Sequence, residues 1–308
     1  MVDAPLGPLA GSAFQLIDPR FRGCVLPDEA VDRIWTGGKW VEGPAWLADI
    51  RTLLWSDIPG DRMLAWNEAT GEVSTFRHPA LGPNGNTVDR EGRLITCEQR
   101  PHRIARLERD GSTTILADTI DGRRFHSPND VVVKSDGSVW FSDPSYGRPR
   151  DRAPGLDVEG CHVYRIDPET GAVRQMTTDF VMPNGLAFSV DESLLYIIDT
   201  GSTHIKGGPN HLRRFRVGQD QSLAGGEVLA TNRAEQFDGL RLDTEGRLWM
   251  GAEDGIHCCL PDGTLIGKVK LPERAANLTF GGANRDELMI TATTSIYRYK
   301  VGVRGAAA

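Results

Sequence analysis

Short apolar segments recur along the chain, and polar turns separate them. In "DVVVKSDGSVWFSD", the apolar residues 131–133 are followed by Asp136-Gly137 and then by the apolar residues 139–141. Two short apolar runs joined by an Asp-Gly pair are typical of two strands and a tight turn. This segment is therefore predicted to be a β-hairpin.

The same hairpin pattern occurs six times, in copies that begin at residues 42, 84, 129, 184, 238 and 277. Each copy except the last is followed by a second pair of apolar runs, as in "RIARLERDGSTTILAD" after the second copy. Two hairpins make one four-stranded unit, and a repeat of about 40 to 55 residues is typical of a propeller blade. The chain is therefore predicted to be all-β, a six-bladed β-propeller with four-stranded blades. A large β-sandwich is the alternative, but it does not predict a sixfold repeat.

The last copy is too short to form a complete blade, since "SIYRYKV" is followed only by a small tail. We expect "DRIWTGG", near the N-terminus, to supply the missing outer strand and to close the ring. The chain then divides into an N-terminal extension (1–30), a single propeller domain (31–303) and a C-terminal tail (304–308). Segments 145–160 and 200–210, rich in Gly, Pro and charged residues, exceed the minimal blade and are predicted to be loops that rise together.

Composition narrows the possible functions only modestly. A formal charge of -7 argues against nucleic acid as a partner, and no apolar run is long enough to span a bilayer. The five cysteines show no CxxC spacing, which favours reduced, buried thiols over a disulfide framework. Without a recognisable signal peptide, we expect a cytoplasmic protein. The oligomeric state is left open.

Each hairpin copy starts with an oxygen-bearing side chain. In a propeller the first strand of each blade lines the central channel, so these six side chains should converge on its axis. We call this set the ring residues: Glu42, Asn84, Asn129, Asn184, Asp238 and Asn277. Buried carboxylates and amides without a cation are unfavourable, and oxygen donors suit Ca²⁺, Mg²⁺ or Mn²⁺. The pattern therefore predicts a central metal site, although turn chemistry is an alternative for the Asn-Gly and Asp-Gly pairs.

A second acidic series follows the second strands of the blades: Asp57, Glu98, Asp143, Asp199 and Glu253. We expect most of these residues to tie loops to the sheets, and some to help neutralise the ion. The tryptophans within the strands, such as Trp55 and Trp140, are expected to pack between blades.

The motifs "EGPAW", "SPNDVVV", "SDPSYG", "PNGLAF", "FDGLRLD" and "NLTFGG" occur in this order from about residue 35 to residue 300. In this combination the chain resembles the regucalcin/senescence-marker-protein and gluconolactonase family, and the bacterial gluconolactonases in particular. The resemblance implies a six-bladed propeller with one divalent ion, expected to be Ca²⁺, with Mg²⁺, Mn²⁺ or Zn²⁺ as alternatives.

By the same resemblance, Glu42, Asn184 and Asp238 are metal ligands, and Asp238 is also the proton donor and acceptor. Asn129 matches a position near the metal that contacts substrate or acts as a fourth ligand. Animal members carry an arginine where this chain has Ser127, so the sugar contacts do not carry over directly. Ser127 together with Glu98, Arg100 or His102 of "CEQRPHRIARL" are candidates for that role.

These residues predict metal-dependent hydrolysis of a sugar lactone, D-glucono-1,5-lactone or a related aldonolactone. The ion would polarise the lactone carbonyl, while Asp238 acts as general base and then as general acid. The chain contains no GxSxG, HExxH or GxxxxGK[ST] motif, which argues against other hydrolase classes. Hydrolysis of other lactones or of phosphotriesters, or a non-catalytic calcium-binding propeller, are the alternatives.

Overall fold

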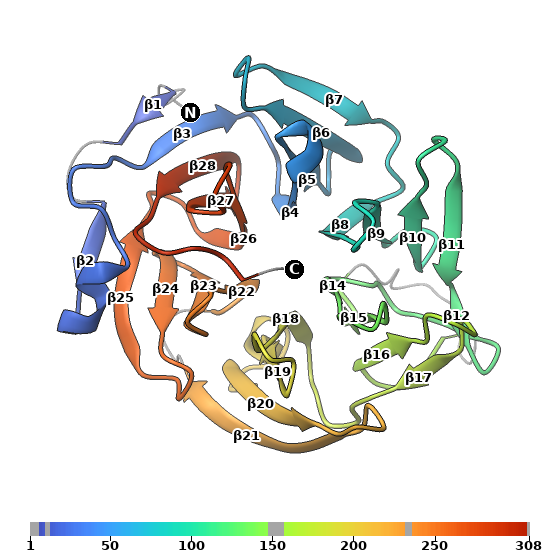
Figure 1. The fold of residues 1–308 in the computed structure, drawn as a ribbon. Coiled ribbons are helices and arrows are strands. Elements are labelled where there is room, and N and C mark those ends of the chain that lie inside the picture. The colour runs from blue at the N-terminus through green and yellow to red at the C-terminus, as the bar shows by residue number, and fades with distance from the viewer. Residues whose placement is uncertain (1–5, 10–12, 147–156, 232–235, 307–308) are drawn as a thin grey trace.

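The computed structural model describes residues 6–9, 13–146, 157–231 and 236–306 of the chain. Within these residues, six antiparallel sheets are arranged around a central axis (Figure 1). The predicted six-bladed propeller with four-stranded blades is therefore confirmed. The first three blades consist of β4 (Val41–Leu47), β5 (Thr52–Asp57), β6 (Arg62–Asn67) and β7 (Val73–Arg77); β8 (Pro83–Val88), β9 (Leu94–Glu98), β10 (Arg103–Leu107) and β11 (Thr113–Ala117); and β14 (Val131–Val133), β15 (Val139–Asp143), β16 (His162–Ile166) and β17 (Val173–Gln175).

The other three blades repeat this order around the ring. They consist of β18 (Pro183–Phe188), β19 (Leu194–Asp199), β20 (His211–Val217) and β21 (Leu223–Thr231); β22 (Leu240–Leu242), β23 (Leu248–Ala252), β24 (Gly255–Cys259) and β25 (Leu265–Lys270); and β26 (Ala275–Gly281), β27 (Glu287–Ala292), β28 (Ser295–Lys300) and β3 (Asp32–Thr36). A small ribbon of β12 (Thr119–Ile120) and β13 (Arg123–Arg124) lies between the second and third blades.

The N-terminal part of the chain closes the ring, as predicted. Strand β3 pairs with β28, with Thr36 opposite Ser295, and so supplies the outer strand of the sixth blade. The preceding residues add β1 (Gly7–Pro8) to β3 and β2 (Phe14–Leu16) to β25, which makes the fifth and sixth blades five-stranded. The 3₁₀ helix η1 (Pro19–Gly23) follows β2. Its residue Phe21 is fully buried, with its ring centre 6.1 Å from that of Trp249.

After β28 the chain returns to the centre of the ring (Figure 1). There the backbone N–H of Ala306 donates to the carbonyl of Leu242 at 2.9 Å. The guanidinium of Arg285 donates to the carbonyl oxygens of Gly305 and Ala306. Residues 304–306 therefore pack against the inner strand β22.

The core lies between blades, where alternating apolar side chains of neighbouring sheets meet. Trp55, Trp140 and Trp249, on the second strands of three blades, are fully buried, so their predicted packing role is confirmed. All five cysteines lie in the described residues, where they are buried and free of disulfides, also as predicted. No described helix has both the length and the apolar character needed to cross a membrane.

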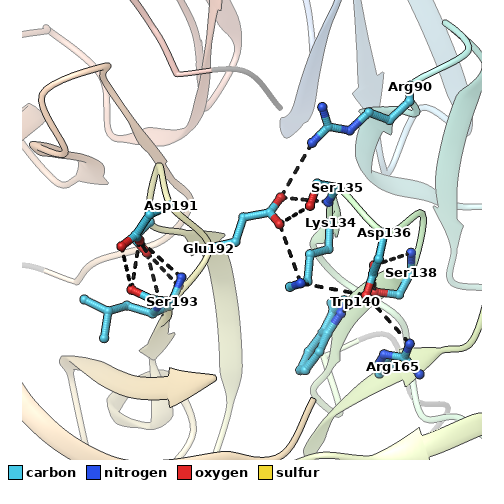
Figure 2. Close-up of polar contacts among 12 residues, drawn as sticks. Arg90, Lys134, Ser135, Asp136, Ser138, Trp140, Arg165, Asp191, Glu192 and Ser193 are labelled. Atoms are coloured by element: carbon cyan, nitrogen blue, oxygen red, sulfur yellow. Dashed lines mark hydrogen bonds and ion pairs between the residues drawn. The ribbon is translucent and has the colours of Figure 1, made fainter. Parts of the chain in front are cut away.

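Turns of three successive blades are tied together at the end of the channel remote from the strand starts (Figure 2). Glu192, in the β18–β19 turn, accepts hydrogen bonds from the backbone N–H of Ser135, at 2.7 Å, and from its hydroxyl. The same carboxylate lies 3.5 Å from Lys134 Nζ and 3.5 Å from Arg90 Nη2. Glu192 therefore links the second, third and fourth blades.

Candidate functional site

The ring residues stand at or just before the starts of the six inner strands. Glu42, Asn84, Asn184 and Asn277 lie within β4, β8, β18 and β26, while Asn129 and Asp238 lie two residues before the first residues of β14 and β22. All six are buried, with between 2% and 6% of each residue exposed. Each blade therefore has one buried polar residue at the start of its inner strand, at the positions that the repeat predicted. Because Asn84 and Asn184 lie inside strands, turn chemistry does not explain them.

Close contact between blades accounts for the glycine that follows several ring residues. The N–H of Gly85 donates to the carbonyl of Asn129 at 2.7 Å, and the N–H of Gly185 donates to that of Asp238 at 3.1 Å. A Cβ atom on Gly43 would lie 2.1 Å from the carbonyl oxygen of Asn84, so no larger residue fits there. These glycines allow the inner strands of neighbouring blades to approach one another, which brings the ring residues together.

The carboxyl group of Glu42 is in an unfavourable electrostatic environment. Burial raises its pKa well above the usual range, and the negative charges of Asp238 and Asp130 raise the pKa further. The hydrogen bond from Gly43 N–H, at 2.7 Å, opposes this rise only in part. Ionised Glu42 therefore lacks a compensating positive charge of comparable strength.

Asp238 is balanced differently, because a guanidinium lies beside it. Burial raises its pKa to about 6, while Arg274 and a hydrogen bond with Asn184 act in the opposite direction. Arg274 Nη2 lies 3.3 Å from Asp238 Oδ2. Asp238 is thus a buried carboxylate that titrates near neutral pH, the range in which a general base is effective.

The amide groups of the ring complete a set of oxygen donors. The Nδ2 of Asn184 donates to Thr200 Oγ1 at 3.2 Å, which fixes one end of that amide. The Oδ1 of Asn84 is buried and has no hydrogen-bond partner in the described part of the chain. A buried amide oxygen without a hydrogen-bond partner is costly unless a further group binds there. Carboxylate and amide oxygens with excess negative charge fit a hard divalent cation.

The donor set differs from the metal centres built from His, Cys, Asp and Glu alone. Among the residues that the structure describes, no group of three or more such side chains is arranged to hold a metal ion. Any ion at the ring would therefore need amide oxygens in addition to the carboxylates of Glu42 and Asp238.

The predicted substrate-binding residues occupy different positions. Asn129 belongs to the ring, but the other three lie in well-defined local contacts. Ser127 is fully buried, with its N–H 2.7 Å from Asp143 Oδ1 and its hydroxyl 2.7 Å from the carbonyl of Pro144. Glu98 is fully buried between two guanidiniums, those of Arg77 and Arg103.

His102 lies in the turn between β9 and β10 in a left-handed conformation (φ +59°). Its Nδ1 is 2.5 Å from the carbonyl oxygen of His126, and the residue is only 4% exposed. The described contacts of His102 and Glu98 thus hold the second blade to its surroundings, and their role toward a substrate stays a prediction.

Three members of the second acidic series share one arrangement. Asp57 accepts from the N–H of Lys39, Asp143 from those of His126 and Ser127, and Asp199 from those of Val181 and Met182. Each carboxylate, at the end of a second strand, fixes the chain that enters the first strand of its own blade. This is the loop-tying role that the sequence predicted. In contrast, the side chain of Glu253 is 43% exposed and pairs with Arg274 at 3.1 Å.

The two predicted loop segments meet near the ring, as far as their described residues show. The ring centres of Tyr146 and His204 are 5.1 Å apart, and Thr203 Oγ1 lies 3.4 Å from the Tyr146 hydroxyl. Burial raises the pKa of Tyr146, and the charge of Asp238 contributes. Residues 147–156 of the first segment lie outside the described residues.

Sequence reasoning missed two charged pairs around the ring. Arg241 lies 3.3 Å from Asp130 Oδ2 inside the channel, and Arg274 contacts both Asp238 and Glu253. Neither arginine has an equivalent in the other hairpin copies, so the alignment of repeats gave no signal for them. Asp130 directly follows Asn129, and that adjacency was the only clue in the sequence.

The comparisons with known proteins agree with this geometry. The family model described as "SMP-30/Gluconolactonase/LRE-like region" matches residues 40–294, which span every ring residue. The chain belongs to this family.

Among similar proteins, the gluconolactonase of Zymomonas mobilis is 28% identical over 317 residues, covering 93% of this chain and 85% of that protein. A 6-deoxy-6-sulfogluconolactonase of Pseudomonas putida is 30% identical, covering 82% of each chain. The solved structure of a gluconolactonase from Xanthomonas campestris matches with a TM-score of 0.85 and 31% sequence identity. The match covers 97% of the present chain and 98% of the Xanthomonas chain.

Proposed function

We propose that this chain hydrolyses a sugar lactone, D-glucono-1,5-lactone or a related aldonolactone, to the aldonic acid. The observation that carries the proposal is the ring: two buried carboxylates with raised pKa values, set among amides, at one end of the channel. The similarity to gluconolactonases over most of the chain supports it.

We further propose that Glu42, Asn184 and Asp238 hold one divalent cation, with Ca²⁺ the expected ion and Mg²⁺, Mn²⁺ or Zn²⁺ the alternatives. Its charge would offset the repulsion between Glu42 and Asp238 and would satisfy oxygen donors that are otherwise buried at a cost. When bound, such an ion would act as a Lewis acid that polarises the lactone carbonyl.

Asp238 is the residue that moves the proton in this proposal. Its carboxylate removes a proton from the attacking water, and then returns that proton to the ring oxygen as the ester bond breaks. A pKa of about 6 leaves the carboxylate mostly ionised at neutral pH yet basic enough to accept the proton. The guanidinium of Arg274 keeps one carboxylate oxygen, Oδ2, engaged at 3.3 Å.

The amides of Asn129 and Asn84 are available to hold hydroxyl groups of the sugar at the ring. The buried Oδ1 of Asn84, which has no partner among the described residues, is suited to accept from one hydroxyl. Around the mouth, Arg274, Glu253 and Gln236 make the surface polar. This polarity favours a polyhydroxylated lactone over an apolar phosphotriester.

The test is a pH-indicator assay of D-glucono-1,5-lactone opening by chelator-treated protein. Ca²⁺, Mg²⁺, Mn²⁺ and Zn²⁺ are added back singly, with Asp238→Ala alongside. We expect activity to require one of these ions, and loss of Asp238 to reduce kcat/KM about 10²–10⁴-fold. Asp191→Asn, a carboxylate removed at the opposite end of the channel, is the control that should retain activity.

Full activity of folded Asp238→Ala would remove the proposed base. Activity that is unaffected by chelation would remove the metal while leaving lactone hydrolysis in place. If the protein binds an ion yet never exceeds the spontaneous rate on any sugar lactone, the non-catalytic calcium-binding propeller becomes the better account.

A further inference from the structure

Arg274 is fixed at the mouth of the candidate site by contacts on several sides. It directly precedes β26, and its Nη1 lies 2.9 Å from Gln236 Oε1 and 3.1 Å from Glu253 Oε1. Its Nη2 faces Asp238 Oδ2, and its guanidinium carbon lies 5.5 Å from the centre of the Trp40 ring. These neighbours come from two blades, the fifth for the three polar ones and the first for Trp40, so the guanidinium is held on more than one side and has little freedom to turn toward a ligand.

The charges in this cluster do not cancel. The single guanidinium of Arg274 forms ion pairs with two carboxylates, Asp238 on the inner side and Glu253 on the outer side. The side chain of Arg274 is 20% exposed, whereas that of Glu253 is 43% exposed and so presents the outermost charge. A substrate that enters the channel therefore meets a carboxylate before it meets the arginine.

Glu253 owes this position to the course of its blade. Strand β23 runs back from the far end of the channel and ends at Ala252, so Glu253 lies at the level of the ring. The corresponding residues Asp57, Asp143 and Asp199 are buried and bind backbone N–H groups. Glu253 departs from these three because its carboxylate turns to a guanidinium at the mouth, and it differs from Glu98, which also pairs with guanidiniums, in being exposed.

We propose that Glu253 masks the charge of Arg274 and thereby makes the site selective for neutral sugar lactones over lactones that carry an acidic substituent. The inference rests on the proposed function and concerns the substrates of that same site. A carboxylate on the substrate would be repelled by Glu253, and Arg274 would not attract it because its charge is already paired. Like charges placed against the wrong ligand are a common source of specificity.

A matched pair of substrates tests this selectivity. D-glucono-1,4-lactone ends in a hydroxymethyl group at the position where D-glucaro-1,4-lactone ends in a carboxylate, and both rings are the same size. The measured quantity is the ratio of kcat/KM for the acidic lactone to kcat/KM for the neutral one. We expect the ratio to be well below one for the wild type and to rise about tenfold in Glu253→Gln, which frees the guanidinium.

Two further variants separate this effect from a general change in surface charge. The Glu253→Gln/Arg274→Gln double variant should lose the gain, because the freed cation is absent. Glu227→Gln removes a carboxylate from another exposed pair, with Arg214 on β20 and β21, and should leave the ratio unchanged. The gain in Glu253→Gln should also shrink in 1 M salt, where exposed charges are screened.

Three results would overturn the inference: a wild type that prefers the acidic lactone, an unchanged ratio in Glu253→Gln, or a gain that survives in the double variant. If the same preparations still hydrolyse D-glucono-1,5-lactone, the proposed function stands and only the inferred selectivity fails. If the wild type opens no lactone, the proposed function fails and the selectivity fails with it.

Discussion

The two ends of the central channel are built by the same six inner strands, yet they differ in packing and charge. At the strand starts, the ring residues are at most 6% exposed, and neighbouring blades bond directly to each other. At the far end, turns surround a cavity of about 1210 Å³ whose lining includes Ile50 and Val190, which are 60% and 55% exposed. One end is crowded and polar, and the other is open and mixed.

In the proposed function, the chemistry takes place at the crowded end and not in this large cavity. A large cavity is ordinarily the first candidate for a ligand site. Here Glu192 pairs with Arg90 and Lys134, while the guanidinium of Arg285 donates to backbone carbonyl oxygens. The crowded end instead holds two carboxylates with raised pKa values and a buried amide oxygen, the signs of a site that binds a charged or polar group.

The largest effect on stability is expected when a side chain is added where two blades are in contact at the ring end. A Cβ on Gly43 (φ +53°) would lie 2.1 Å from the carbonyl oxygen of Asn84, whereas a Cβ on Gly92 (φ +79°), in a far-end turn, meets nothing closer than Asp49 Oδ2 at 3.3 Å. Gly43→Ala should therefore lower the free energy of unfolding by more than about 4 kcal/mol, and Gly92→Ala by roughly 1–2 kcal/mol for the backbone conformation alone.

Urea unfolding of the two variants measures the difference, since both residues have positive φ and only Gly43 has the clash. Equal losses would mean that the ring end tolerates expansion as easily as the far end does. The contrast in packing between the two ends would then not hold.

A smaller effect is expected from the ring carboxyl groups on the pH dependence of the free energy of unfolding. Burial raises the pKa of Asp238 to about 6, and the pKa of Glu42 is raised as well. Between about pH 4 and pH 7 these two carboxyl groups then bind more protons in the folded protein than in the unfolded chain. In the presence of chelator, the contribution of these two groups to the free energy of unfolding should therefore fall as the pH rises through this range, by roughly 2–3 kcal/mol for Asp238 alone.

Unfolding of the wild type and of Asp238→Asn at several pH values isolates this contribution. Burial raises the pKa of Asp143 to about 7, so this residue also contributes to the slope of the free energy of unfolding against pH. Its contribution is the same in both proteins and cancels in the comparison. A saturating divalent cation should also reduce the wild-type slope. Identical slopes for the two proteins in chelator would mean that the ring carboxylates are not destabilised in the folded state.

The repeat made most of the fold predictable. Six copies of one hairpin pattern determined the number of blades, and the shortness of the last copy pointed to residues 32–36 as the closing strand. The same alignment placed all six ring residues, because equivalent positions in a repeat become neighbours around the axis. Any feature that recurs in each blade could thus be found from the sequence.

Features that occur once could not be found in this way. Arg241 and Arg274 approach Asp130 and Asp238 from other blades, over 111 and 36 residues of sequence. Such contacts depend on how far each blade is rotated and how deeply its loops reach, which no local pattern records. Glu253 aligned with Asp57 and Asp199 in sequence, yet it pairs with a guanidinium instead of backbone N–H groups.

The smallest effect is expected at the far end, where Glu192 joins three blades. Its carboxylate accepts from Ser135 and lies 3.5 Å from both Lys134 and Arg90, but the side chain is 20% exposed and its partners remain accessible to water. Glu192→Gln should therefore cost no more than about 1 kcal/mol of stability and change kcat/KM on D-glucono-1,5-lactone less than about twofold. Glu42→Gln makes the same replacement at the ring end, where it removes a proposed ligand, and should abolish most activity. A tenfold loss in Glu192→Gln would place the far end in the reaction, because the described contacts of Glu192 hold turns together and do not reach the ring.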